Sequence, residues 1–220
     1  MEKHKYLMLD CETFGTFQKP VVYDLGLAVV DNKGRIYAKY SFIIDDTFYG
    51  MQERAKTAYY AWKFPAYHED IENGRRRVIS WAGAMYIANR LVEKWDIKAV
   101  IAHNAHFDFT AVNYTTELLK HHKRFFQSSV EWWDTLSMVS DTIAKQKLYV
   151  EWCKNHNYMT KNGQPRMTAE IIYKYITHDD TFEESHTGLE DVLIEIRIFA
   201  KCVACKKKMK RGFFDFSGRH

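Results

Sequence analysis

The sequence predicts an α/β fold in which a mixed sheet opens with an antiparallel meander and is flanked by helices. Strand-like segments fill the first 44 residues, helical spacing follows, and short apolar strands then alternate with helices. That order of elements is typical of a mixed sheet covered by helices. The chain has 220 residues, of which 46% are hydrophobic, so we expect one domain with one substantial core.

The meander is predicted from three segments. Lys5–Leu9 alternates loosely between apolar and polar residues and ends in Asp10-Cys11-Glu12. Val21–Val30 and Ile36–Ile44 are strand-like and are joined by the turn Asp31-Asn32-Lys33-Gly34. The three strands should therefore pair in chain order.

Two helices are expected next, over Phe48–Phe64 and Val78–Trp95, because apolar residues recur there at intervals of three and four. Pro65 and Arg75-Arg76-Arg77 should separate them. Further along, the patterns predict a buried strand over Ala99–Ala102 and a helix over Phe109–Lys120. A strand with a helix is expected within Glu131–Ile143, a loop over Lys161–Arg166 and a short helix over Ala169–Ile176.

The last helix is predicted by a capping box. In Thr187-Gly188-Leu189-Glu190, Thr187 is expected as the N-cap, with Glu190 reaching back to it. An apolar stripe then continues to Val203. His186 should lie on the loop just before the cap, and Asp191 should lie in the first turn.

Carboxylates and a histidine follow the ends of these predicted elements. Asp10 and Glu12 stand two apart at a strand end, so their side chains leave the same face of the sheet, although taken alone they also fit a loop start. Asp108 follows the buried strand, where it can be a third carboxylate or the N-cap of the next helix. His186 and Asp191 complete the set.

Together these five residues meet the requirements of two-metal phosphodiester hydrolysis. Paired carboxylates repel each other unless a cation lies between them, and Mg²⁺ or Mn²⁺ prefers such oxygen ligands. One metal ion activates water and the other stabilises the leaving 3′ oxygen. Imidazole, whose pKa lies near neutral pH, is suited to take the proton from that water.

The motifs resemble those of the DEDDh (DnaQ-like) 3′-to-5′ exonucleases, which include the proofreading subunit of bacterial replicative polymerase, ribonuclease T and oligoribonuclease. Leu9–Gly15 is similar to the first motif, Asn104–Asp108 to the second, and His186 with Asp191 to the third. Asp10 and Asp108 are 98 residues apart, and Asp191 follows 83 residues later. The resemblance covers about residues 5–200.

The resemblance implies a ribonuclease H-like fold and a metal-dependent exonuclease that releases nucleoside monophosphates. Asp10, Glu12 and Asp191 would hold one divalent cation, Asp10 and a water-bridged Asp108 the other, and His186 would be the base. Thr13, Phe14 and Asn104 would approach the substrate. Phe14 could stack on a base, or it could be a core aromatic at the strand end.

The end of the chain is basic. Residues 201–220 contain seven Lys/Arg and one Asp, a net charge of +6, whereas the rest of the chain carries −2. We therefore expect a domain over residues 1–205 and a basic tail over 206–220 that contacts nucleic acid or is simply solvated. The candidate contacts are Lys206, Lys207, Lys208, Lys210 and Arg211.

Four cysteines are too few for a disulfide scaffold and fit a reducing compartment, and no apolar run approaches a membrane span, so the sequence predicts a cytoplasmic protein. Cys202 and Cys205 form a C-x-x-C pair that could bind zinc with Cys153 and His156, or could simply face successive turns of a helix. The expected partner is a single-stranded 3′ end. The resemblance leaves open a polymerase or other replication protein as a partner, and a homodimer.

Single-stranded DNA is favoured slightly over RNA as substrate, although the same kind of site cuts both polymers and nothing in the sequence recognisably reads a 2′-hydroxyl. A 3′-to-5′ exoribonuclease is the first alternative. A catalytically silent subunit that binds nucleic acid or a polymerase is the alternative from another class.

Overall fold

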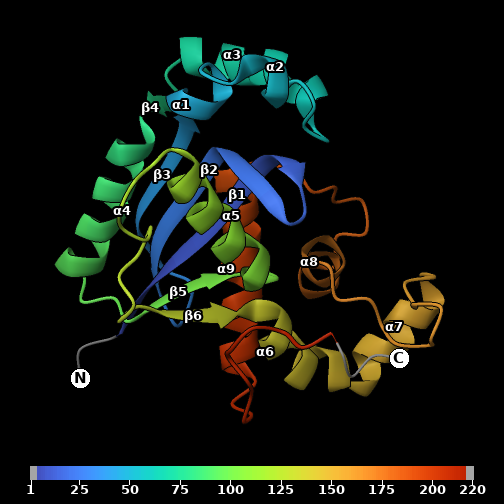
Figure 1. Ribbon diagram of the computed structural model, residues 1–220. Coiled ribbons are helices and arrows are strands. Elements are labelled where there is room, and N and C mark those ends of the chain that lie inside the picture. Colours follow the sequence, from blue (N-terminus) through green and yellow to red (C-terminus); the bar gives the residue numbers. More distant parts are fainter. Residues whose placement is uncertain (1–3, 217–220) are drawn as a thin grey trace.

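The structure is a computed structural model that describes residues 4–216, and it confirms the mixed sheet (Figure 1). In this described part a six-stranded sheet has the order β4-β3-β2-β1-β5-β6. The strands are β1 (Lys5–Thr16), β2 (Lys19–Asp31), β3 (Ile36–Ile44), β4 (Arg77–Ile79), β5 (Ala99–Ala102) and β6 (Glu131–Asp134). β1, β2 and β3 form the antiparallel meander, and the three later strands each pair parallel with a neighbour.

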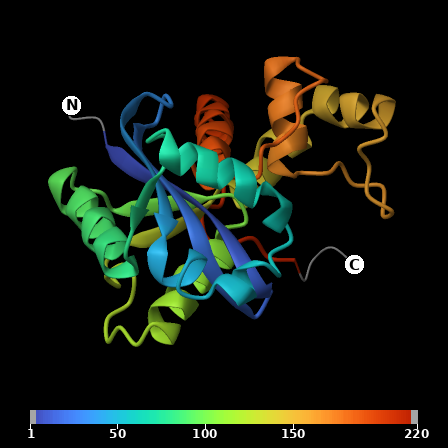
Figure 2. The ribbon, with the colours of Figure 1, turned by 90° about the horizontal axis from the view of Figure 1, so that it is seen from above.

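Helices cover both faces of the sheet, as the view from above shows (Figure 2). Leu7 and Leu9 of β1 pack with α4 (Trp81–Lys94) and α5 (Ala105–Leu118), whereas Met8 between them belongs to the core on the other face. That second core is formed with α6 (Thr135–Asp141), α8 (Ala169–Thr177) and α9 (Gly188–Ala204). The alternation of side chains along β1 thus supplies both cores.

A helix and a short strand are among the elements that had no counterpart in the sequence prediction. The helix α7 (Lys147–Asn155) follows the 3₁₀ turn η2 (Ile143–Lys145), and its buried Tyr149 and Cys153 join the core of α8 and α9. The short strand β4 forms where the second of the two predicted helices was expected to begin.

The single helix predicted over Phe48–Phe64 is wrong. The segment forms the short helices α1 (Asp45–Phe48) and α2 (Gln52–Ala55) and the 3₁₀ turn η1 (Ala61–Lys63), and Pro65 lies in the first turn of α3 (Phe64–Glu72). Its apolar residues recur at helical intervals because they pack around a separate cluster at one end of the sheet, which contains Tyr23 and Phe48. Burial in that cluster needs turns in the chain, which one straight helix would not provide.

The basic tail expected from the sequence is not detached from the domain over residues 206–216, since its backbone is hydrogen-bonded to Asp134 and Asp141. Residues 1–3 of the predicted domain and residues 217–220 of the predicted tail lie outside the described residues. No helix within residues 4–216 is long and apolar enough to cross a membrane.

Candidate active site

The start of α9 lies directly against the sheet. A Cβ atom on Gly26 of β2 would come within 2.3 Å of the Gly188 carbonyl, so the two backbones touch where no side chain would fit. The Gly188 N–H donates to Asp24 Oδ2 at 3.0 Å, and Asp24 lies opposite Glu12 in the β1–β2 register. This contact brings the first turn of α9 to the acidic end of β1.

Three carboxylates meet at that point. Oxygen atoms of Asp10, Glu12 and Asp191 all lie within 4.8 Å of one another. Asp10 and Glu12 project from the same face of β1, and the strand has a bulge immediately after Glu12. The structure therefore brings together the three residues that were expected to share a cation.

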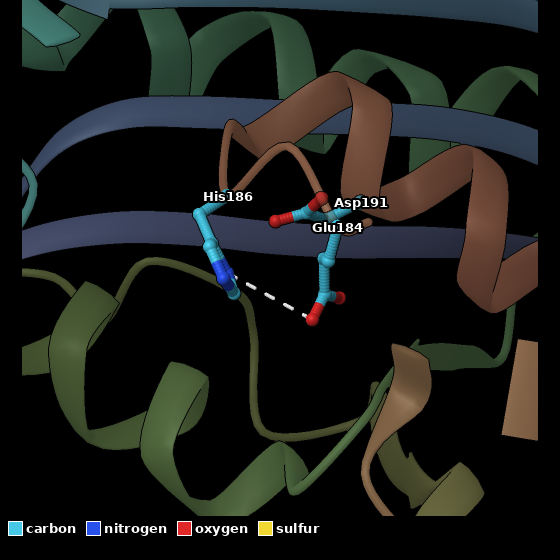
Figure 3. A group of neighbouring side chains, drawn as sticks. All are labelled: Glu184, His186 and Asp191. Carbon is cyan, nitrogen blue, oxygen red and sulfur yellow. Dashed lines mark ion pairs between the residues drawn. The ribbon is translucent and has the colours of Figure 1, made fainter. Parts of the chain in front are cut away.

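His186 belongs to a second group that shares Asp191. Ligand atoms of Glu184, His186 and Asp191 also lie within 4.8 Å of one another, and the His186 Nδ1 is 3.8 Å from Glu184 Oε2 (Figure 3). His186 lies on the loop before α9 with φ of +48°, a left-handed conformation that turns the chain between Glu184 and the helix. The loop position predicted for His186 is confirmed.

Two residues of the segment before α3 hold this loop. The Tyr60 ring stacks on His186 with centroids 4.4 Å apart and 13° between the planes. The Lys63 ammonium donates to the carbonyl oxygens of Ser185 and His186. Desolvation, followed by the Lys63 charge, lowers the pKa of His186 below its ordinary value. The neutral imidazole is thereby favoured, which is the form that can accept a proton.

Asp108 lies deeper. It is the fourth residue of α5 rather than the N-cap, a position that Asn104 occupies. It is 2% exposed and accepts a hydrogen bond from Cys11 Sγ at 3.2 Å. Burial raises the pKa of Asp108 to about 7.

Glu195, one turn after Asp191 on α9, is a further buried carboxylate. Its Oε1 accepts from the His103 N–H at 3.1 Å, and its Oε2 has no hydrogen-bond partner within residues 4–216. Burial, followed by the charges of Asp108 and Asp191, raises the pKa of Glu195 well above its ordinary value. A carboxylate oxygen buried without a partner beside other acids is a place where a cation would be stabilising.

A cleft of about 650 Å³ is lined by Asp10, Glu12, Glu184, His186, Asp191 and Glu195, whereas Asp108 is buried behind it and does not line it. Burial is the largest cause that raises the pKa of Glu12 to about 9 and of Asp191 to about 8, and other carboxylates add to it. The pKa of Asp10 is raised well above its ordinary value by burial and by the charges of Asp108, Glu195, Asp191 and Glu12. Several neighbouring carboxylates whose pKa values are raised form a site with too little positive charge to stabilise their ionised forms. The Lys63 ammonium supplies only part of the charge that the site needs.

The remaining predicted substrate contacts are distributed unevenly. Asn104 lines the cleft, with φ of +63° and its N–H donating to Asp134 Oδ1 at 3.0 Å. Thr13 is half-buried. Phe14 is 2% exposed and packs with the cluster around Tyr23, so the structure favours the core interpretation over base stacking.

The basic residues after α9 are exposed but do not line the cleft. Lys206, Lys207, Lys208, Lys210 and Arg211 all belong to this group, and the Arg211 guanidinium lies 4.3 Å from the centre of the Trp133 ring. Cys202 is buried, whereas Cys205 lies 3.5 Å from Gln146 Nε2. In the part of the chain that the structure describes, no cysteine belongs to a group of three ligand atoms close enough to hold a metal ion.

The predicted capping box is wrong in its bonding, although Thr187 is the N-cap of α9. The Thr187 hydroxyl donates to Glu190 Oε2 at 2.7 Å instead of accepting from the helix, because Glu190 is also ion-paired at 2.9 Å with Arg76. The first N–H of the helix is satisfied by Asp24.

Four residues of the site were not predicted from the sequence: Tyr60, Lys63, Glu184 and Glu195. Glu195 stands four residues after Asp191, so extending the helical face of Asp191 by one turn would have found it. Glu184 lies two residues before His186, but nothing in that loop distinguishes it from Glu183. No local signal indicates Tyr60 or Lys63, because only the folded chain brings them to the His186 loop.

Comparison with solved structures confirms the fold. A full-length 3′-exonuclease superposes with a TM-score of 0.59 at 8% sequence identity, covering 99% of this chain and 93% of that chain. E. coli exonuclease I in complex with an oligonucleotide gives 0.57 at 15% identity, covering 94% of this chain and 41% of that one. Cell-death related nuclease 4 superposes with a TM-score of 0.51 at 11% sequence identity, covering 95% of this chain and 67% of that chain.

The chain therefore has the ribonuclease H-like fold of 3′-exonucleases, as the resemblance implied. It spans less than half of the exonuclease I chain. No protein-family model matches the sequence, and no curated protein matches it either.

Proposed function

We propose that this protein is a metal-dependent 3′-to-5′ exonuclease that releases nucleoside monophosphates from the 3′ end of single-stranded DNA. The observation that carries the proposal is the meeting of Asp10, Glu12 and Asp191 within 4.8 Å, next to His186, in a chain with the fold of 3′-exonucleases. Acids alone are common on protein surfaces, whereas these acids are raised in pKa, line one cleft and come from distant parts of the chain.

The donor set fits hard divalent cations. Asp10, Glu12 and Asp191 offer only oxygen ligands, which suits Mg²⁺ or Mn²⁺. Asp108 lies outside this group of three and would help to hold the second cation through a bridging water. When bound, the two cations would activate the attacking water and stabilise the leaving oxygen. Glu195, whose Oε2 has no hydrogen-bond partner within residues 4–216, would add negative charge behind them once the cations favour its ionised form.

The chain's own groups would place and move the proton. His186, held flat against Tyr60, would accept the proton of the attacking water through a ring nitrogen, and the lowered pKa keeps that nitrogen free at neutral pH. The nearby Glu184 carboxylate would stabilise the imidazolium that forms. The Lys63 contacts with the backbone would keep the His186 loop in place.

We favour single-stranded DNA as the substrate, and this choice is supported by solved structures of exonuclease I, which has this fold, in complex with such DNA. The first alternative is exoribonuclease activity, since the acidic centre acts on a phosphodiester in either polymer. The test is digestion of matched, end-labelled single-stranded DNA, duplex DNA and RNA with Mg²⁺ or Mn²⁺. A one-nucleotide ladder growing from the 3′ end, abolished by a chelator, is the expected result.

Variants make the test specific. Asp10→Ala and Asp191→Ala should lower turnover by several orders of magnitude, because each removes a ligand shared in the cation site. Asp180→Ala, which removes an exposed acid outside the cleft, is the matched control and should digest like the wild type. Normal turnover in the Asp10 or Asp191 variant would contradict the assignment.

His186→Ala separates a base from a ligand. A base should lose about 10²- to 10⁴-fold in rate while Mn²⁺ affinity is kept. The group of Glu184, His186 and Asp191 could instead hold a metal ion directly, in which case Mn²⁺ binding measured by calorimetry would weaken sharply. A silent binding subunit, the alternative from another class, would bind DNA and show no digestion under any of these conditions.

A further inference from the structure

The last described residues return to the catalytic cleft. After α9, the Lys210 N–H donates to Asp141 at 2.9 Å, the Asp134 N–H donates to the Arg211 carbonyl at 2.7 Å, and the Phe214 N–H donates to Asp134 Oδ2 at 2.9 Å. Because Asp134 is fully buried at the end of the edge strand β6, it fixes this segment to the sheet. Figure 1 shows the segment in red, leaving the foot of α9 and crossing α6.

Three phenylalanines follow the anchor and differ in their surroundings. Phe213 contacts Phe109 and His106 on α5, with ring centroids 5.5 and 5.3 Å away. Phe214 packs against the core beneath α9. Phe216 is 57% exposed and meets Phe214 edge-on at 4.9 Å.

Phe214 and Phe216 line the same cleft as the catalytic carboxylates. The Phe214 ring is therefore a support, and the Phe216 ring lies open in the cleft. A large apolar ring exposed in a polar cleft, on an anchored segment, is typical of a surface that is covered when a ligand binds.

Two cations from another segment line this cleft. Lys161 and Arg166, in the loop between α7 and α8, are exposed, and neither forms an ion pair with any residue from 4 to 216. The floor of the cleft is acidic, whereas this part of its wall is basic and aromatic. Cations combined with an exposed ring are the features with which proteins hold an unpaired strand: phosphates on the charges and a base on the ring.

We propose that Phe216, supported by Phe214, is a stacking platform for an unpaired base of the substrate strand, and that Lys161 and Arg166 bind its phosphates. The inference rests on the proposed exonuclease function and makes it specific for single strands. A base inside a duplex is stacked on both faces and paired at its edge, so only a splayed strand can place a base on the ring.

The test is binding of a fluorescent ten-residue oligothymidylate, measured by anisotropy with Ca²⁺ in place of Mg²⁺ to limit cleavage. Phe216→Ala should weaken binding about 5- to 100-fold, which corresponds to the loss of one stacked base. Phe216→Trp should keep the affinity, whereas Phe216→Leu, which is apolar without an aromatic face, should not. Tyr86→Ala is the matched control, because Tyr86 is 67% exposed on α4 and lines a different cavity.

A series of oligonucleotides with a single abasic position then locates the stacked base. At one position near the 3′ end, removing the base should weaken wild-type binding and leave Phe216→Ala binding unchanged. Equal affinity of wild type and Phe216→Ala for the intact strand would overturn the platform while leaving the exonuclease proposal standing. A wild-type protein that neither binds nor digests the strand would overturn both.

Discussion

Arg76→Met should destabilise the fold strongly, because Arg76 is a buried cation that joins three elements at the site. It is 5% exposed and pairs with Asp24 at 3.2 Å, Asp70 at 3.0 Å and Glu190 at 2.9 Å. Methionine keeps a long apolar side chain but removes the charge, together with the guanidinium that lies 4.8 Å from the centre of the Tyr67 ring. Asp24, which is fully buried, would be left without its cation.

The expected cost follows from that burial. Breaking a buried ion pair by removing one partner costs about 3–5 kcal/mol, and for a chain of this size each kcal/mol lowers Tm by about 2–4 °C. Arg76→Met should therefore lower Tm by roughly 6–20 °C in a thermal scan followed by circular dichroism. The loss should be smaller at pH 5 than at pH 8, because desolvation already raises the pKa of Asp24 and a protonated Asp24 needs no partner.

The neighbouring Arg75 provides the control. It pairs with Asp70 at 2.6 Å and with Glu69 at 3.3 Å, but its side chain is half exposed, so Arg75→Met should change Tm by no more than about 2 °C. Equal Tm values for the two variants would refute the argument that the buried network holds the start of α9 against the sheet.

Three further outcomes are expected. Glu195→Gln should weaken Mn²⁺ binding about 10- to 100-fold in a calorimetric titration, because it removes a charge beside the ligands; unchanged affinity would show that this carboxylate does not support the cations. Tyr60→Ala should lower kcat about 10- to 100-fold by releasing the His186 ring, whereas Tyr59→Ala, 86% exposed, should not; matching rates would exclude the positioning role. Chelator-treated protein should lose stability as the pH rises from 6 to 9. The reason is that cleft carboxylates such as Asp191, with a pKa of about 8 in the folded state and near 4 in the unfolded state, hold protons in this range only when the protein is folded. A Tm that rises over this range would contradict these pKa shifts, and added Mg²⁺ should raise Tm more at pH 8.5 than at pH 6.

The sequence correctly predicted the strands whose boundaries depend on residues of the same segment. Ile36–Ile44 and Ala99–Ala102 form as predicted, the first beside its turn and the second as a fully buried apolar run. β1 extends to Thr16, beyond its predicted end, because β2 continues to pair with it past the bulge after Glu12. Such an extension depends on the partner strand, which the sequence of β1 does not contain.

The five predicted catalytic residues came from three short motifs, each of which spans only a few positions of the chain. The residues that support them depend on contacts between distant segments: Tyr60 and His186 are 126 positions apart in the chain, and Glu195 contacts the backbone of His103 across the sheet edge. Helical periodicity also misled over Phe48–Phe64, because a small cluster around Tyr23 satisfies the same apolar residues in a folded-back chain. The spacing of apolar residues indicates which side chains are buried, and the same side chains can be buried by different paths of the backbone.

The basic tail shows how composition and geometry answer different questions. Charge alone leaves open whether Lys206, Lys207 and Lys208 contact a polyanion or are simply solvated. Because α9 rises about 1.5 Å per residue, these lysines lie roughly 20 Å from Asp191. They can therefore reach only a strand that extends well beyond the cleft, whereas Phe214 and Phe216 of the same segment lie inside it. Truncation after Cys205 would remove both features and would also uncover the edge of β6, so its effect on binding could not be assigned. Replacing the three lysines by serine keeps the aromatic residues, and it should reduce the log–log salt dependence of binding by about 0.7 for each phosphate of a long single strand that the lysines no longer neutralise, with no change on a strand too short to leave the cleft.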